Sequence, residues 1–418
     1  MRFGAGGLLV LGVGAYLLLL WPLRDPHPTE HPALGAIAVR GVRIYLSAVE
    51  APIEHGTLVA RDGVITRVGP DVVIPPDALL LPCDHCVVTA GYWNAHVHFT
   101  EGKWDLADWK SKATLDAQLG DMLTSRGFTT VVDAGSDPRV TLPLRRRIES
   151  GELLGPAIYT AAAALYPPDG IPYYLKSTLP PYVTWFMPQP ASPDEAARAV
   201  EWNLAHGADL LKLFTGSYVA RGKVLPMPVD IARAAVEVAH RNHRLVYSHA
   251  SNLAGTEVAV QSGVDVLAHA PDSPEGIGTA LLRAMIDRHM AMIPTLKMFA
   301  TTVTAKPGYL RPIYAEVREF HALGGQLLFG TDVGYMTDHG TEDELRALAE
   351  CGLGAREILQ MLTSAPAERF GVGDRRGTIA PGKQADFVLL GGDPFRDLMA
   401  FASVRATVRG GRVLYLHP

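Results

Sequence analysis

The middle of the chain alternates short apolar runs, rich in β-branched residues, with longer amphipathic stretches. This alternation is typical of βα units repeated around a parallel sheet. The runs predict eight strands, over Val87–Ala95, Thr129–Ala134, Ala157–Ala162, Leu210–Phe214, Leu245–His249, Val264–His269, Met292–Leu296 and Gln326–Thr331. The stretches between them predict helices, among them Pro193–His206, Pro228–Arg241, Leu253–Ser262, Ile277–Arg288 and Ile313–Ala322. Together they predict an α/β fold, a TIM-like (β/α)8 barrel with catalytic groups at the carboxyl ends of its strands.

Both ends of the chain have a different pattern, in which short alternating strands are broken by turns. Asp62-Gly63 is a hairpin signal in the N-terminal stretch, and residues 377–390 and 404–414 alternate in the same way. Neither end has enough strands for a stable sheet of its own. We therefore expect residues 36–86 and 375–418 to pair into one small composite β-sandwich domain, with the barrel, residues 87–374, inserted between them.

The first residues are predominantly apolar. No charged residue occurs from Phe3 to Leu23, which is about the length of a membrane span. Residues 1–24 predict a hydrophobic helix that acts as a membrane anchor, and the proline-rich residues 25–35 predict a tether. The alternative is a cleaved signal segment that leaves a secreted or periplasmic protein, but Trp21-Pro22 follows the apolar run where small residues would be expected. By analogy with signal anchors, the catalytic domain is expected on the extracytoplasmic (periplasmic) side.

Composition excludes some partners. A formal net charge of -5, with no stripe of basic and aromatic residues, excludes nucleic acid as the expected partner. Three cysteines cannot build a disulfide framework or a zinc knuckle, so Cys83-Asp-His-Cys86 is read as a turn in which a local disulfide can form. The pattern leaves open whether the chain forms a homo-oligomer.

Potential metal ligands end several of the predicted strands. His96 and His98 end the first strand, where alternate side chains share a face. Imidazole is the commonest protein ligand for divalent metals. The later strands end in His249, His269 and Asp332. Each residue alone is readily explained by packing, but their shared position at strand ends predicts a metal centre.

Lys212 lies inside an otherwise apolar strand, where an ammonium beside metal cations would be repelled. Carbamylation by carbon dioxide would turn it into an anion whose two oxygens can bridge two metals. The alternative is that Lys212 pairs with a carboxylate beneath a site for one metal.

These motifs resemble the amidohydrolase superfamily, in particular its imidazolonepropionase-related branch, which holds metal-dependent prolidases and arginine carboxypeptidases. The resemblance runs from about residue 36 to the C-terminus and includes Pro381-Gly-Lys-Gln-Ala-Asp-Phe-Val388. It implies two divalent ions, expected to be zinc, and assigns their ligands: His96, His98 and Asp332 for one, His249 and His269 for the other, and carboxylated Lys212 between them. Many relatives have Asp two residues before the first histidine, where this chain has Asn94.

The predicted function is hydrolysis of an amide-type C–N bond in a dipeptide or N-acyl amino acid, by attack of a metal-bridging hydroxide with Asp332 as general acid/base. Candidate substrate contacts in the loops are Tyr166, Tyr218, Arg221 and His339. Two alternatives stay open: a mononuclear hydrolase or deaminase of a cyclic amide or amidine, and a catalytically inactive, membrane-anchored interaction module.

Overall fold

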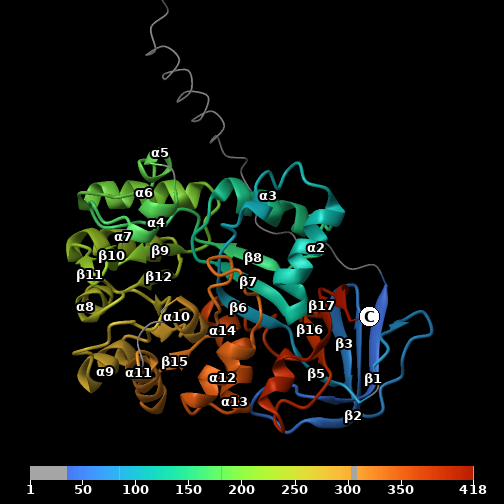
Figure 1. The fold of residues 1–418 in the computed structure, drawn as a ribbon. Coiled ribbons are helices and arrows are strands. Elements are labelled where there is room, and N and C mark those ends of the chain that lie inside the picture. The colour runs from blue at the N-terminus through green and yellow to red at the C-terminus, as the bar shows by residue number, and fades with distance from the viewer. Residues whose placement is uncertain (1–34, 84, 180, 303–307, 418) are drawn as a thin grey trace, which may run out of the picture.

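A computed structural model describes residues 35–83, 85–179, 181–302 and 308–417 (Figure 1). The hydrophobic segment predicted over residues 1–24 and nearly all of the tether lie outside the described residues. Among the residues that the structure describes, no helix is long and apolar enough to cross a membrane.

The barrel consists of eight parallel strands that form two hydrogen-bonded groups. The first group is β6 (Tyr92–Val97), β7 (Phe128–Asp133) and β8 (Ala157–Thr160), and the second is β9 (Leu211–Phe214), β12 (Val246–His249), β13 (Val266–Leu267), β14 (Ala291–Met292) and β15 (Gln326–Leu327). Two seams close the ring. The amide of Ala95 donates to Phe329 O at 2.7 Å, and the amide of Phe214 donates to Leu165 O at 2.9 Å. The predicted TIM-like barrel is therefore confirmed.

The ring is surrounded by the helices of the βα units. They are α2 (Lys112–Met122), α3 (Pro138–Glu149), α4 (Tyr173–Thr178), α5 (Pro181–Thr184), α6 (Pro193–Ala205), α7 (Val229–Arg241), α8 (Leu253–Ser262), α9 (Thr279–Asp287), α10 (Leu296–Thr302), α11 (Leu310–Ala322), α12 (Glu342–Glu350), α13 (Ala355–Leu362) and α14 (Ser364–Arg369), with 3-10 turns η1 (Gly102–Trp104) and η2 (Thr124–Arg126). A third 3-10 turn, η3 (Leu398–Ala402), lies after the barrel in the C-terminal part of the chain. Local signals fix several ends: the Ser192 side chain accepts from Glu195 N at the start of α6, and Gly263 ends α8 in the left-handed conformation. A hairpin, β10 (Gly216–Ala220) and β11 (Lys223–Pro226), follows β9.

Both ends of the chain join one eight-stranded sheet beside the barrel (Figure 1). Its strands are β1 (Ala36–Ile44), β2 (Ile53–Arg61), β3 (Val64–Gly69), β4 (Leu79–Leu80), β5 (Val87–Ala90), β16 (Phe387–Leu390), β17 (Val404–Arg409) and β18 (Arg412–Leu416). Val64 of β3 bridges to Gln384, just before β16, so the sheet folds back on itself. It encloses a separate apolar core that includes Val39, Leu58 and Phe387. The pairing of the two ends agrees with the composite domain expected from the sequence.

Some strand predictions need correction. The strand predicted over Val87–Ala95 is two strands: β5 pairs with β16 in the terminal sheet, and only β6 belongs to the barrel. The backbone changes partners at Gly91, whose amide donates to Asp386 O at 2.9 Å while the next amide, of Tyr92, donates to Gly127 O at 3.1 Å. Glycine is required there because a Cβ would lie 2.3 Å from the Thr129 hydroxyl. The strand predicted over Met292–Leu296 ends at Met292, and Leu296 begins α10.

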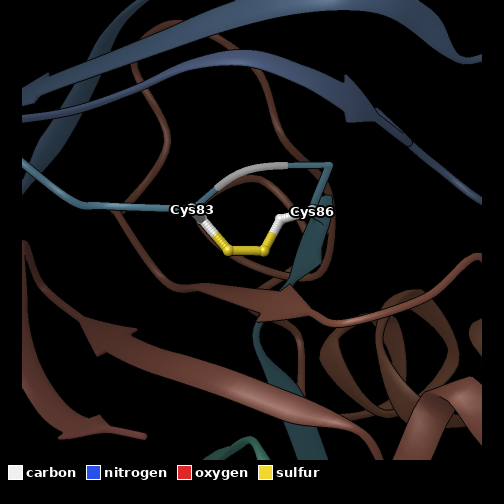
Figure 2. Close-up of a disulfide and its surroundings, with 2 residues drawn as sticks. All are labelled: Cys83 and Cys86. Carbon is white, nitrogen blue, oxygen red and sulfur yellow. A yellow bond between two sulfur atoms is a disulfide. The ribbon is translucent and has the colours of Figure 1, made fainter. Parts of the chain in front are cut away.

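The cysteine pair Cys83 and Cys86 forms a disulfide between β4 and β5 (Figure 2). This agrees with the local disulfide considered from the sequence. The third cysteine, Cys351, is buried and free.

Glu316 is an unusual member of the buried face of α11. It lies beside Ile313 and Val317, and neither of its carboxylate oxygens has a hydrogen-bond partner among the described residues. Burial and then the charge of Glu319 raise its pKa from 4.5 to about 8. The folded protein therefore holds a proton that the unfolded chain releases between these values, so this group makes stability fall as pH rises from 4.5 to 8.

We expect Glu316→Met to increase the free energy of unfolding at pH 8 by about 1–3 kcal/mol, because it removes a buried carboxyl group without a partner. The gain should be smaller at pH 5, where the folded carboxyl group is protonated. Thermal unfolding at both pH values measures the difference, with Glu237→Met, on the exposed face of α7, as the control. An equal gain at both pH values would contradict this account of Glu316.

Candidate metal centre

Three of the predicted ligands meet where β6 and the chain after β15 lie side by side. The Nε2 atoms of His96 and His98 are 3.2 Å apart. Asp332 Oδ1 lies 3.4 Å from His96 Nε2 and 3.1 Å from His98 Nε2. The Asp332 amide donates to His96 O at 2.9 Å, so the barrel seam itself fixes this carboxylate against the histidine pair. The structure thus brings together the first predicted ligand set.

The other ring nitrogen of three of the histidines is held by the scaffold. His96 Nδ1 lies 2.7 Å from Ala268 O, and His98 Nδ1 lies 2.8 Å from Gly135 O. A carbonyl can only accept, so both Nδ1 atoms carry a proton, and in the neutral ring Nε2 keeps its lone pair. Burial lowers the pKa of His98, but the hydrogen bond and charge of Asp332 outweigh it and raise that pKa. His269 Nδ1 is 2.7 Å from Thr295 Oγ1, whose own hydroxyl donates to Pro294 O. His269 therefore also keeps Nε2 as its acceptor nitrogen.

His249 and His269 continue the cluster around the barrel mouth. The ring centroid of His269 is 4.5 Å from that of His96 and 4.7 Å from that of His249. Burial, and then the charge of Lys212, lower the pKa of His249 to about 3. Burial likewise lowers the pKa of His269 and of His96 well below 6.5. These imidazoles are neutral near pH 7, which is the form that binds metal.

Lys212 lies beside this cluster on β9, with Phe214 next to it on the same side of the strand. Only 2% of Lys212 is exposed, and its Nζ lies 5.6 Å from the Phe214 ring centroid. Burial lowers the pKa of the ammonium from 10.5 to about 7, although the charge of Asp332 opposes this shift. No carboxylate of the described residues lies within 4.0 Å of Nζ, so the structure does not provide the Lys212–carboxylate pair of the alternative hypothesis.

The donor set fits a divalent cation. His96, His269 and Asp332 each offer one ligand atom, and these atoms lie within 4.8 Å of one another. Asp332 Oδ1 is buried and has no hydrogen-bond partner among the described residues. A buried carboxylate oxygen facing neutral imidazole nitrogens is costly unless a cation compensates it. Imidazole and carboxylate are also ligands that zinc accepts.

Asn94 has a defined role beneath this set. Its Oδ1 accepts from the amides of His96 and Thr331, both at 3.2 Å, and its Nδ2 donates to Thr331 Oγ1 at 2.8 Å. Two backbone donors fix the orientation of the amide, since only its oxygen can accept. Asn94 therefore connects the residue before Asp332 to the first histidine.

Asp133, at the end of β7, was not identified from the sequence. Its Oδ1 accepts from Ser136 Oγ at 2.5 Å and from the Gly135 amide at 3.2 Å, and its Oδ2 accepts from Thr141 and Thr160, both at 2.8 Å. Gly135 provides the carbonyl that binds His98 Nδ1. Asp133 thus holds the loop that orients His98, and its place at a strand end was the available sequence signal.

We expect Asp133→Ala to weaken zinc binding by about 10- to 100-fold, as is usual when support behind a metal ligand is removed. Asp133→Asn, which keeps an acceptor oxygen for Gly135 and Ser136, should stay within about threefold of the wild type. Competition with a zinc chelator measures the affinity, and thermal unfolding of metal-free protein reports any general loss of fold. Unchanged zinc affinity in Asp133→Ala would show that Asp133 has only a structural role.

The predicted substrate contacts lie in different surroundings. The Tyr218 hydroxyl lies 3.0 Å from both Asp272 Oδ1 and Ser273 Oγ, and Tyr309 donates to the other oxygen of Asp272. Arg221 is exposed at the tip of the β10–β11 hairpin. Tyr166 is buried, with its ring stacked on Phe214 at 4.5 Å between centroids.

His339 is engaged in a loop network instead of facing the ligand cluster. Its Nδ1 lies 2.8 Å from Asp121 Oδ2, and its Nε2 lies 3.2 Å from Lys103 Nζ. Both ring nitrogens therefore have partners within the chain. A substrate contact by His339 would require one of these bonds to break.

A model of the amidohydrolase family matches residues 87–414. The chain belongs to this family. Ochratoxinase of Aspergillus niger is 24% identical over 409 residues, covering 87% of this chain and 83% of that protein. Among solved structures, a Xaa-Pro dipeptidase with bound methionine has a TM-score of 0.77 at 21% identity and covers 91% of this chain and 100% of its own. A prolidase complexed with N-methylphosphonate-L-proline has a TM-score of 0.75 at 23% identity, with the same coverage.

This membership confirms the resemblance inferred from the strand-end motifs and agrees with the barrel. This amidohydrolase is a hydrolase that acts on carbon–nitrogen bonds. Because its solved relatives are less than 25% identical, they support the fold and leave the substrate to be argued from the site.

Proposed function

We propose that this amidohydrolase cleaves the amide bond of dipeptides or N-acyl amino acids at a centre of two zinc ions. His96, His98 and Asp332 would hold one ion, His249 and His269 would hold the other, and a carbamate on Lys212 would supply ligand oxygens to both. The observation that carries the proposal is the buried, unpartnered Asp332 Oδ1, which faces the free Nε2 atoms of His96 and His98.

Two divalent cations bound there would lower the pKa of a water and polarise the scissile carbonyl. The chain supplies the proton transfer. The Asp332 carboxylate lies against the histidine pair, where it would take the proton of the attacking water and deliver it to the leaving nitrogen. His96, His98 and His269 keep their orientation because each donates its Nδ1 proton to a scaffold oxygen.

The carbamate is supported by the surroundings of Lys212. The described residues provide no carboxylate partner for its Nζ. Its lowered pKa leaves a fraction of neutral amine near pH 7, which is the form that reacts with carbon dioxide. Carbamylation would also replace a charge that repels metal ions with one that binds them.

A mononuclear hydrolase or deaminase of a cyclic amide or amidine is the second candidate. It is favoured by the compact group of His96, His269 and Asp332, which takes ligands from both predicted half-sites. About two zinc ions per chain would support the first candidate, and about one would support the second. The third hypothesis, an inactive interaction module, predicts that at least one ligand position has lost its metal-binding residue. All six predicted ligand residues are present in this chain.

A panel of dipeptides, N-acyl amino acids and cyclic amides, screened with zinc-analysed protein, tests the proposal. We expect hydrolysis of at least one dipeptide or N-acyl amino acid. Hydrolysis of cyclic substrates alone would favour the second candidate, and no hydrolysis anywhere in the panel would favour the third.

We further propose that residues 1–24 anchor the protein and that the catalytic domain lies on the extracytoplasmic side. The Cys83–Cys86 disulfide supports an oxidising compartment. Removal of residues 1–24 should then release an active protein from the membrane fraction. Persistent membrane association of this truncated protein would contradict the single anchor.

A further inference from the structure

Two loops of the barrel touch each other through tyrosine rings. Tyr174 lies on α4, after β8, and Tyr335 lies in the loop after β15. Their ring centroids are 6.0 Å apart, with the rings edge to face. Tyr173 packs against Tyr174 in the same manner, at 5.7 Å. We call these three residues the tyrosine bridge.

The barrel topology places this bridge at the rim that carries the metal ligands. Going round the ring, β6 and β7 lie between β15 and β8. The contact therefore joins the segments that follow the two strands flanking β6 and β7. His96 and His98 lie at the end of β6, so their strand lies between those two strands in the ring.

A backbone hydrogen bond to Asp332 connects the tyrosine bridge to the metal centre. The Tyr335 amide donates to Asp332 O at 3.2 Å, so the tyrosine is held by the backbone of the proposed general acid/base. Burial, and then the charge of Asp332, raise the pKa of Tyr335. For Tyr174 burial is also the main cause of its raised pKa, and Asp332 and Asp272 both contribute.

The bridge also presents apolar surface that the protein does not cover. Tyr335 is 45% exposed and Tyr173 is 36% exposed. The hydroxyls of Tyr174 and Tyr335 form no hydrogen bond with the described residues. Tyr218, on the β10–β11 hairpin, differs in this respect because its hydroxyl is bound to Asp272 and Ser273. Partly exposed aromatic rings are suited to pack edge to face against another ring.

We propose that Tyr174 and Tyr335 form one wall of the substrate pocket and thereby determine specificity. This wall selects substrates that carry a large apolar group, above all an aromatic one, next to the scissile amide. This inference rests on the proposed function, since it concerns the same site. It adds Tyr335 to the candidate substrate contacts, gives Tyr174 a specific role, and names a substrate class within the amides.

A matched pair of ligands tests the wall without requiring catalysis. 3-Phenylpropionate and propionate share a carboxylate, lack an amide bond and differ by one phenyl group. Calorimetric titration of the zinc-loaded, full-length protein should show at least tenfold tighter binding of 3-phenylpropionate. In Tyr335→Ala and Tyr174→Ala this ratio should fall below threefold. Tyr174→Phe, which keeps the ring, and Trp202→Ala, an exposed aromatic residue on α6, should keep the ratio of the wild type.

Equal or absent binding of the two acids by the wild type would contradict the proposed wall. An unchanged ratio of the two affinities in both alanine variants would also contradict it. Hydrolysis is measured separately with N-acetyl-L-phenylalanine and N-acetylglycine. The alanine variants should raise KM for the phenylalanine substrate about tenfold with little change in kcat, and leave the glycine substrate within twofold. A protein that prefers 3-phenylpropionate but hydrolyses no amide would contradict the proposed function and support the wall.

Discussion

Asp332→Asn is expected to lower kcat/KM for amide hydrolysis by about 10³-fold, within the range usual for loss of a general acid/base. Asparagine has nearly the same shape but cannot take up the proton of the attacking water or deliver it to the leaving nitrogen. It also removes the negative charge that faces His96 and His98 at 3.4 and 3.1 Å. Steady-state kinetics on the best substrate of the panel, with zinc content measured on the same sample, would give the size of the loss.

The matched control is Asp287→Asn, an exposed carboxylate at the end of α9, for which no change in rate is expected. Thermal unfolding of both variants separates loss of chemistry from loss of fold. Because Asp332 has a positive φ of 58°, a conformation that asparagine tolerates well, the backbone should be unaffected by the substitution. Retention of more than a tenth of the activity by Asp332→Asn would exclude it as the general acid/base.

Lys212→Ala is expected to reduce the zinc content from about two ions per chain to one or fewer and to abolish measurable hydrolysis. The variant loses the carbamate proposed to lie between the two ions, and it opens a space beside Phe214 that a small carboxylic acid can enter. Millimolar propionate or formate should therefore restore part of the activity. Metal analysis and assays with and without the acid measure these effects.

Lys176→Ala, on the exposed side of α4, is the matched control and should keep both ions. The decisive outcome concerns metal and activity together. If Lys212→Ala kept two zinc ions and full activity, the bridging carbamate would be wrong. One retained ion with substantial activity would instead favour the mononuclear candidate.

The barrel could be predicted because each βα unit carries its own local signals. Ser192 and Gly263 mark helix ends within a few residues, and the apolar strand runs are long enough to recognise. The division between β5 and β6 was missed because the apolar pattern continues from Val87 to Ala95. The two strands differ in their partners, since β5 pairs with β16 and β6 pairs with β7, and hydrophobic periodicity does not contain such contacts between distant segments.

The candidate metal centre could be predicted for a similar reason. The topology of a parallel barrel places all strand ends at one rim, so His96, His249, His269 and Asp332 had to lie near one another. The partners of these residues depend on loops whose course is not repetitive. Asp133 acts through Gly135, and Tyr174 meets Tyr335 across two strands, so neither role follows from sequence spacing. The same limit applies to His339. Its position in the loop after the last strand suggested a substrate contact at the barrel mouth, but its ring nitrogens bind Asp121 and Lys103.

The most direct test of the central claim is a zinc titration of chelator-treated protein, with hydrolysis of the best dipeptide or N-acyl amino acid measured at each step. Bicarbonate should be present throughout, so that Lys212 can be carbamylated. We predict no activity in the metal-free protein and a rise that reaches its plateau near two equivalents of zinc. Full activity without metal, or no activity at any zinc content, would contradict the assignment of these six residues as a hydrolytic metal centre.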